Sequence, residues 1–111
     1  MANLEAYRTS IEKLITEYSH YKLPYGDVQC HKIFDRENDH YQLLNMGWHG
    51  YKRIFGCVLH LDIIDGKIWI QHDGTDIGIA DELVALGVSK QDIVLAFHAP
   101  SMRKYTEFAV A

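Results

Sequence analysis

The chain has few cysteines, and this shortage excludes several classes of protein. Only Cys30 and Cys57 occur among the 111 residues. Two cysteines cannot form the disulfide framework of a small secreted domain. The sequence also has no Cys-x-x-Cys motif and no Cys/His pair at zinc-ligand spacing. Both cysteines lie in apolar, strand-like runs, where a free thiol usually packs as a small apolar side chain.

Segments that would carry the chain to or through a membrane are also missing. No apolar run approaches the roughly 18 residues that a membrane-spanning helix needs. The first residues, MANLEAYRTS, lack the basic and apolar regions of a signal peptide. We therefore expect a cytoplasmic protein that acts without a membrane. Its length is that of a single domain, residues 1–111.

Positive charge is scarce as well. The chain has 11 Lys and Arg against 15 Asp and Glu, for a net charge of -4. Proteins that bind duplex DNA alone are usually basic, because Lys and Arg displace the counterions of the phosphates. The densest basic pairs here are only Lys52-Arg53 and Arg103-Lys104. Direct DNA binding by this chain alone is therefore disfavoured, although folding could gather these charges on one face.

The stretch from Cys57 to Leu86 predicts the centre of the fold. Asp65-Gly66 lies between two β-rich runs, which favours a type I′ hairpin. A two-residue loop pairs Ile63 with Ile68, and further along His60 with Gln71 and Leu59 with His72. One face then carries the aliphatic side chains of Leu59, Leu61, Ile63, Ile68 and Ile70. The other face carries His60, Asp62, Trp69 and Gln71, and it can remain uncovered for a partner.

Residues 2–22 predict the helix that covers the aliphatic face. Its apolar residues recur at alternating spacings of three and four, at Leu4, Tyr7, Ile11, Leu14, Tyr18 and Tyr21. Pro24 and Gly26 are expected to end it. The same stripe has the a/d spacing of a coiled coil. Tyr7, Leu14 and Tyr18 are therefore also candidates for self-association with a second copy.

Further strands are predicted on both sides of the central hairpin. Residues 27–34 and 40–48 form two strands, His49-Gly50 forms a turn, and a third strand runs from Tyr51 to Ile64 with a bulge at Gly56. After the hairpin, Thr75 caps a helix that runs to Leu86 and stops at Gly87, although Gly78 in its first turn could delay the regular helix to Ile79. A capped turn at Ser89, a strand over 93–97 and a C-terminal segment docked on the body or on a partner follow.

The predicted fold class is α+β. An N-terminal helix packs on a mainly antiparallel β-meander of about four strands, and a helix, one further strand and a short C-terminal cap follow.

Catalytic motifs are absent from the sequence. His60 and Asp62, with His72 and Asp73 at the strand end, could bind a divalent ion or transfer protons. A solvated sheet face with polar cross-strand pairs explains the same residues. Neither cysteine has an activating neighbour, and there is no Gly-x-Ser-x-Gly. We therefore assign no catalytic residue, metal ligand or cofactor and do not expect an enzyme.

Several segments resemble the XisI family, the excision controlling factors of the fdxN element in filamentous cyanobacteria. The most specific are DGKIWIQ, DGTDIGIADEL, GVSKQDIVLAFH and RKYTEFAVA, and YQLLNMGWHGYKRIFGC also fits. The resemblance covers essentially the whole chain, with mild departures at Ser89 and Ala99, where relatives often have Pro. It implies a partner called XisH, which is similar to nucleases, together with a site-specific recombinase. It implies no enzymatic activity and no catalytic residues.

Three functions follow from these observations. The leading hypothesis is a non-enzymatic accessory factor, resembling XisI, that acts through protein partners in programmed DNA element excision. The first alternative is a nucleic-acid-binding protein that uses a sheet face with Trp48, Trp69 and nearby Lys or Arg. The second is a small metal-binding protein or enzyme built on the His/Asp cluster. A homo-oligomer is compatible with each of them.

Overall fold

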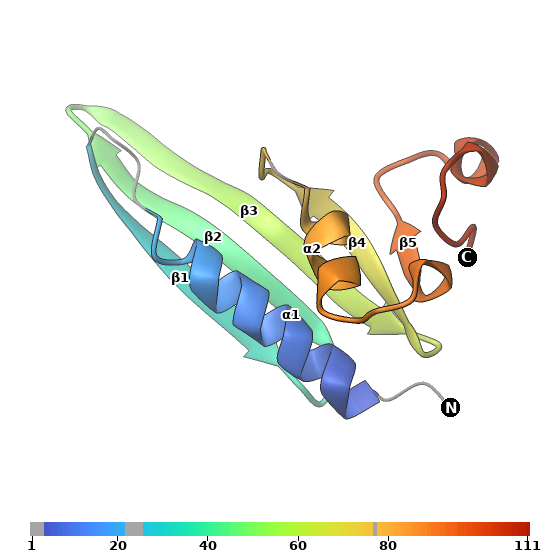
Figure 1. Ribbon diagram of the computed structural model, residues 1–111. Helices are drawn as coiled ribbons and strands as arrows, with labels where there is room; N and C mark the ends of the chain where they lie inside the picture. The colour runs from blue at the N-terminus through green and yellow to red at the C-terminus, as the bar shows by residue number, and fades with distance from the viewer. Residues whose placement is uncertain (1–3, 22–25, 77) are drawn as a thin grey trace.

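The computed structural model describes residues 4–21, 26–76 and 78–111, which form two helices and a five-stranded sheet (Figure 1). In chain order the elements are α1 (Leu4–Tyr18), β1 (Asp27–Asp35), β2 (His40–His49), β3 (Lys52–Ile64), β4 (Lys67–Asp73), α2 (Ile79–Ala85), the 3-10 turn η1 (Lys90–Asp92), β5 (Ile93–Leu95) and the 3-10 turn η2 (Pro100–Tyr105). The sheet order is β1-β2-β3-β4-β5, antiparallel except for the parallel pair β4-β5. The predicted α+β class and four-stranded meander are confirmed.

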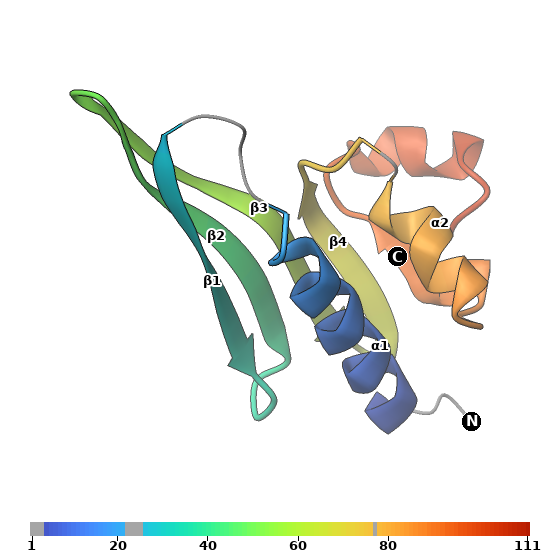
Figure 2. The ribbon, with the colours of Figure 1, turned by 60° about the vertical axis from the view of Figure 1, so that its left-hand side comes forward.

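The core lies between the sheet and the two helices, which cover the same face (Figures 1 and 2). All five aliphatic side chains that the hairpin register placed on one face are at most 8% exposed. Ile11, Leu14 and Ile15 of α1 pack against them, and Ile79 and Leu83 of α2 complete the cover. Each fully buried aliphatic side chain contributes about 1.5–3 kcal/mol, so this face accounts for much of the fold's stability.

Helix α1 is shorter than the sequence predicts. It ends at Tyr18, and Ser19 and His20 form a turn. The Ser19 hydroxyl donates to the Thr16 carbonyl oxygen at 2.6 Å, and the Tyr21 N–H donates to the Tyr18 carbonyl. These local bonds replace the helical pattern, so the prediction that the helix reaches residue 22 is wrong. Residues 2, 3, 22 and Pro24 lie outside the described part of the chain.

The central hairpin has the predicted turn. Asp65 and Gly66 have φ values of 53° and 79°, and positive φ at both positions is the signature of a type I′ turn. The other predicted turn is shifted by one residue. His49 pairs with Lys52, so Gly50 and Tyr51 form the loop in place of His49 and Gly50.

Two bulges change the predicted register. Leu43 pairs with Leu59 and Leu44 with Cys57, so the extra residue of β3 is Val58 and not Gly56. In the next pair of strands His60 lies opposite His72, which makes Gln71 the extra residue of β4. The predicted pairs His60–Gln71 and Leu59–His72 are therefore wrong, whereas the pairs closer to the turn are confirmed. Each bulge bends its strand and increases the local twist.

The second helix begins at Ile79, the later of the two starts that the sequence allowed. Its N-cap residue is Gly78, and Thr75 instead accepts a bond from the Gly78 N–H at 3.3 Å. The Asp73 carboxylate accepts from the N–H groups of Thr75 and Ile79, so it organises this turn. The last helical residue is Ala85, Leu86 is the C-cap, and Gly87 with a φ of 101° follows it as the predicted stop.

The C-terminal segment docks on the body of the protein, which was one of the two predicted outcomes. Strand β5 is shorter than the predicted 93–97, because the chain turns after Leu95. The chain then returns beside β5, where the Ala109 N–H donates to the Ile93 carbonyl at 2.9 Å. No helix in the described ranges is both long and apolar enough to cross a membrane.

The carboxylate of Asp39 ties α1 to the sheet, and its ionisation should make stability depend on pH. Arg8 donates to both Asp39 oxygens at 2.7 and 3.1 Å, and the buried Tyr41 hydroxyl donates at 2.9 Å. The Arg8 hydrogen bond holds the pKa of Asp39 below its usual range. A carboxyl whose folded pKa is lowered stabilises the fold above its unfolded pKa. This stabilisation is lost as the pH falls through the folded value.

We expect Asp39→Asn to lower the free energy of unfolding by about 1–2 kcal/mol at pH 7, because one charged partner is removed from three hydrogen bonds. The difference from the wild type should shrink below about pH 4, where Asp39 of the unfolded wild type is protonated. Urea unfolding from pH 7 to pH 3 measures it. Glu37→Gln, an exposed change in the same turn, serves as the control. A gap that stays constant with pH would contradict this role.

Candidate functional site

The sheet face opposite the two helices carries the residues that the sequence predicted as a partner face. Side chains alternate along a strand, so residues between the buried aliphatic positions point away from α1 and α2. His60 and Asp62 of β3 and Trp69 and Gln71 of β4 lie on this second face. The structure brings all four together, and their role in binding a partner stays a prediction.

Asp62 is the centre of a hydrogen-bonded cluster on this face. Its side-chain oxygen Oδ1 lies 2.8 Å from His40 Nδ1 and 3.0 Å from His60 Nε2. The other oxygen, Oδ2, accepts a bond from Gln71 Nε2 at 3.3 Å. Asp62 is only 7% exposed, which differs from the open position that the sequence suggested. The cluster therefore holds a largely buried carboxylate among three polar side chains.

Two histidines bond to the same oxygen of the buried carboxylate. The hydrogen bond with Asp62 raises the pKa of the His40 imidazole above its ordinary value. The His40 side chain is 54% exposed and that of His60 is 30% exposed, so both rings reach solvent. His40 was missing from the sequence-derived cluster, and His72 and Asp73, which the sequence grouped with it, do not join it. The Asp73 carboxylate bonds to the turn before α2.

The C-terminal segment covers part of the same face. The guanidinium of Arg103 lies over the Trp69 ring, 5.4 Å from its centroid, and Arg103 is 9% exposed. Its three donor nitrogens bond to the backbone carbonyls of His98, Ala96 and Val110. Trp69 is thus partly covered by the C-terminal segment, and nothing in the sequence pattern of β4 indicated this cover. The part of the face that remains free lies beyond the cluster, toward β1.

Apolar side chains are exposed on the arm that β1, β2 and β3 form. Figure 1 shows these strands extending past the end of α1, and the molecule measures 48 × 29 × 24 Å. Trp48 is 51% exposed and Phe55 is 65% exposed. Arg53 lies over both rings, at 5.2 and 5.9 Å from their centroids. Trp48 and Arg53 are paired across β2 and β3, and Phe55 follows on the same face.

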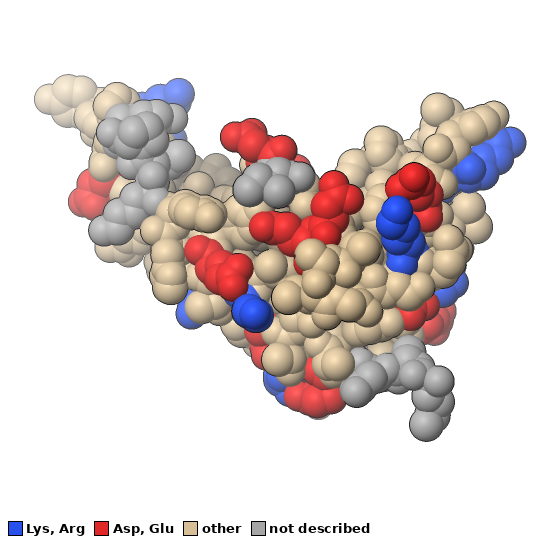
Figure 3. All heavy atoms as spheres, viewed as in Figure 1, with Lys and Arg blue, Asp and Glu red and all other residues tan. Residues whose placement is uncertain are grey.

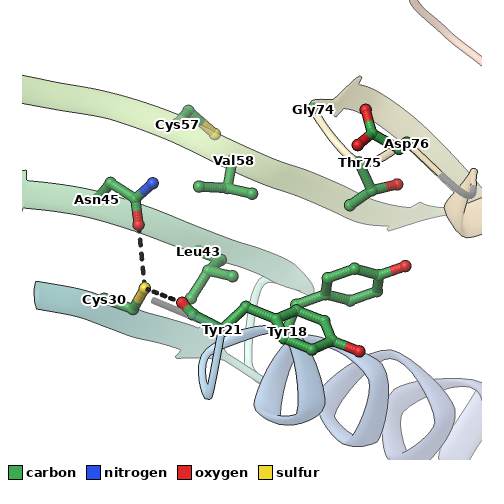
Figure 4. Close-up of a pocket in the computed structure, with 10 residues that line it drawn as sticks. All are labelled: Tyr18, Tyr21, Cys30, Leu43, Asn45, Cys57, Val58, Gly74, Thr75 and Asp76. Carbon is green, nitrogen blue, oxygen red and sulfur yellow. Dashed lines mark hydrogen bonds between the residues drawn. The ribbon is translucent and has the colours of Figure 1, made fainter. Parts of the chain in front are cut away.

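A hollow of about 490 Å³ lies on the helical side, between the end of α1, β1, β3 and the turn after β4 (Figure 4). Cys30 and Cys57 line it, and Cys30 Sγ donates to Asn45 Oδ1 at 3.0 Å. Burial raises the pKa of both thiols. A thiol with a raised pKa is a poor nucleophile near neutral pH, so this hollow lacks an activated cysteine.

The three residues of α1 that were predicted for self-association contact the rest of the chain. Leu14 is 4% exposed in the core. The Tyr18 hydroxyl donates to Glu82 Oε2 at 2.8 Å, and the Tyr7 hydroxyl donates to Asp92. Burial raises the pKa of each tyrosine to about 12, so both stay protonated donors. Their predicted role in self-association stays a prediction, and the structure shows that all three side chains contact other parts of the same chain.

The charged side chains on the helical side reflect the acidic composition of the chain. Figure 3 shows that acidic side chains gather near the middle of this view, whereas Lys and Arg are scattered singly over it. Among the described residues, folding therefore creates no basic patch on the side seen in Figure 3.

These features define a small α+β protein in which one sheet face is covered by helices and the other is only partly covered. The family model for the XisI protein matches residues 1–110. The chain belongs to the XisI family. This confirms the resemblance seen in the sequence.

Two solved structures have the same fold over nearly the whole chain. An XisI-like protein from Anabaena variabilis ATCC 29413 is 46% identical, with a TM-score of 0.91 over 98% of this chain and 100% of that one. The fdxN element excision controlling factor XisI from Anabaena variabilis ATCC 29413 is 42% identical, with a TM-score of 0.84 over 97% of this chain and 98% of that one. No curated protein matches this chain.

Proposed function

We propose that this chain is a non-enzymatic controlling factor of DNA element excision that acts by binding a protein partner, an XisH-like protein that works with a site-specific recombinase. Membership in the XisI family, which contains a solved excision controlling factor, supports the process. The observation that carries the binding role is the partly covered sheet face. It presents the exposed aromatic rings of Trp48 and Phe55 on the arm.

The chemistry of this face suits a protein partner better than a substrate. Aromatic side chains and arginine are enriched at the energetic centres of protein interfaces, and Arg53 already stacks on Trp48 and Phe55. The polar cluster around Asp62 lies further along the same sheet face, toward the other end of β2 and β3. The two cysteines with raised pKa values provide no reactive nucleophile.

Co-purification with an XisH-like protein tests this function, followed by titration calorimetry at micromolar concentrations. We expect Trp48→Ala and Phe55→Ala each to weaken binding at least tenfold, about 1.4 kcal/mol, because truncating a central aromatic ring usually costs more than 1 kcal/mol. Both rings are exposed, so neither change should unfold the protein. Tyr105→Ala is the matched control, because Tyr105 is 72% exposed at the other end of the molecule.

Two results would count against this function. A failure to form any complex at micromolar concentrations would remove the proposed partner. Equal binding by the wild type, Trp48→Ala and Phe55→Ala would show that the partner binds at a different surface.

Direct nucleic-acid binding is the competing function, and the stack of Arg53 on two exposed rings is the observation that favours it. Electrophoretic shifts at low and moderate salt separate the two. Because nonspecific contacts weaken steeply with salt, only binding that persists at higher salt and prefers one sequence would place nucleic acid ahead of a protein partner.

A further inference from the structure

Three side chains of the second sheet face present metal-ligand atoms to one point. The atoms come from His40, His60 and Asp62, and all three lie within 4.8 Å of one another. His40 and Asp62 are directly paired across β2 and β3, and His60 lies two residues before Asp62 on the same face. The backbone of two paired strands therefore fixes the positions of all three residues.

The distances among these atoms are a few tenths of an ångström shorter than those around a shared tetrahedral ion. Asp62 Oδ1 is 2.8 Å from His40 Nδ1 and 3.0 Å from His60 Nε2. Two ligand atoms of a tetrahedral ion, each about 2.0–2.1 Å from the metal, lie about 3.3 Å apart. An ion could thus replace the hydrogen-bonding protons with small movements of the rings. Each neutral imidazole would then carry its proton on the nitrogen that faces away from the ion.

The carboxylate is held in the orientation that a ligand needs. Gln71 Nε2 donates to Asp62 Oδ2 at 3.3 Å, whereas Oδ1 of the same carboxylate bonds to the two histidines. Hydrogen bonds of this kind orient metal ligands in proteins. Asp62 is 7% exposed, and a buried carboxylate gains from a nearby cation. The bulge that makes Gln71 the extra residue of β4 lies directly beside this site.

We propose that His40, His60 and Asp62 bind one divalent transition-metal ion of the zinc type. Two imidazole nitrogens and one carboxylate oxygen suit Zn²⁺, Co²⁺ or Ni²⁺, whereas Ca²⁺ and Mg²⁺ prefer oxygen ligands alone. Three protein ligands leave at least one coordination position for water or for a partner's side chain. The half-exposed His40 ring is on the solvent side of the site. This binding is independent of the proposed excision role.

Protein without a histidine tag, stripped with a chelator, is titrated with Co²⁺ and Zn²⁺. We expect one ion per chain, visible Co²⁺ absorption bands, and a higher unfolding temperature with Zn²⁺, because an ion that binds only the folded state stabilises it. His60→Gln and Asp62→Asn should each weaken binding at least tenfold. His31→Gln is the control, because His31 is an exposed residue of β1 that is absent from the cluster.

The wild type alone also tests the site, which matters if Asp62→Asn folds poorly. Bound Co²⁺ should broaden the NMR signals of the His40 and His60 rings before those of His31 and His98. The proposal is overturned if the wild type and His60→Gln bind Zn²⁺ equally, or if the broadening begins at other histidines. Competition by Ca²⁺ at the same concentration as Zn²⁺ would also overturn the assigned class of ion.

Discussion

Replacing Gly47 by alanine should detach β1 from the sheet and lower the free energy of unfolding by about 3 kcal/mol, at the upper end of the usual range for overpacking. A Cβ atom at this position would lie 2.0 Å from the Asp27 carbonyl oxygen and 2.7 Å from Val28 Cα. Both atoms belong to the backbone of β1, which pairs with β2 through Val28 and Gly47. No side-chain rotation can relieve this contact, so the strand itself must move.

The damage should be confined to the arm. Strand β1 is at the edge of the sheet and pairs only with β2, whereas the core lies under α1 and α2. Hydrogen exchange should therefore rise across residues 27–34 in Gly47→Ala and remain slow in β3 and β4. Because Trp48 follows directly, partner binding through the exposed rings should fall as well.

Gly56→Ala is the matched control for this change. Gly56 lies in β3 of the same arm, and a Cβ atom there has nothing within 4 Å. Alanine in this position should leave stability within about 0.5 kcal/mol or raise it slightly, because it reduces the freedom of the unfolded chain. Equal stability of the two variants by urea unfolding would show that β1 tolerates a displacement at Gly47.

The fold was largely predictable because its strongest signals are local. Asp65-Gly66 determines a hairpin by its own backbone preference, and the alternation beside it determines which side chains are buried. Gly87 ends α2 for a similar reason, since its φ of 101° favours glycine. Each of these predictions depends on a few neighbouring residues, and each is confirmed.

The polar cluster could be predicted only in part, because it depends on the register of β2 and β3, which the sequence predicts incorrectly. Counting back from the predicted turn at His49-Gly50, with the predicted bulge at Gly56, places His40 opposite His60. The actual loop at Gly50-Tyr51 shifts the pairing by two residues, so that His40 lies opposite Asp62, and the bulge lies at Val58 in place of Gly56. Residues with alternating polarity fit either register at the strand end, so the sequence did not reveal that His40 joins His60 and Asp62.

The cover on Trp69 was unpredictable for a different reason. Arg103 is separated from Trp69 by a strand, two turns and a helix, and it satisfies backbone carbonyls of its own segment. An arginine that bonds to carbonyls leaves no spacing pattern in the sequence. In the sequence, Arg103 and its neighbour Lys104 form one of the two dispersed basic pairs, and nothing marks Arg103 as buried.

Arg103→Ala should loosen the C-terminal segment and lower the free energy of unfolding by about 3 kcal/mol. Its Nε donates to the His98 carbonyl at 3.1 Å, and its two terminal nitrogens donate to Ala96 and Val110 at 3.3 and 3.4 Å. Truncation leaves these acceptors without their charged donor, and each such loss costs about 1–3 kcal/mol. The contact with the Trp69 ring contributes roughly 0.5–2 kcal/mol more.

Water should recover part of that loss, which keeps the total well below the sum of these contributions. The Trp69 Nε1–H is buried and has no hydrogen-bond partner among the described residues. Removal of the guanidinium would let water reach this donor and the freed carbonyls. In a Trp48→Phe background, where Trp69 is the remaining tryptophan, the fluorescence of Arg103→Ala should therefore shift to longer wavelength.

The comparison with Arg103→Met separates charge from packing. Methionine keeps much of the apolar stem over Trp69 but donates no hydrogen bond, so we expect it to lie between the wild type and alanine in stability. Lys104→Ala, at the exposed neighbouring position, should change the unfolding midpoint little. Thermal unfolding should show a drop of roughly 10–15 °C for Arg103→Ala, with faster hydrogen exchange over residues 96–111. Equal stability of Arg103→Ala and Lys104→Ala would contradict this role of Arg103. The C-terminal segment would then be held by the pairing of Ala109 with Val94 of β5, and Trp69 would stay covered without Arg103.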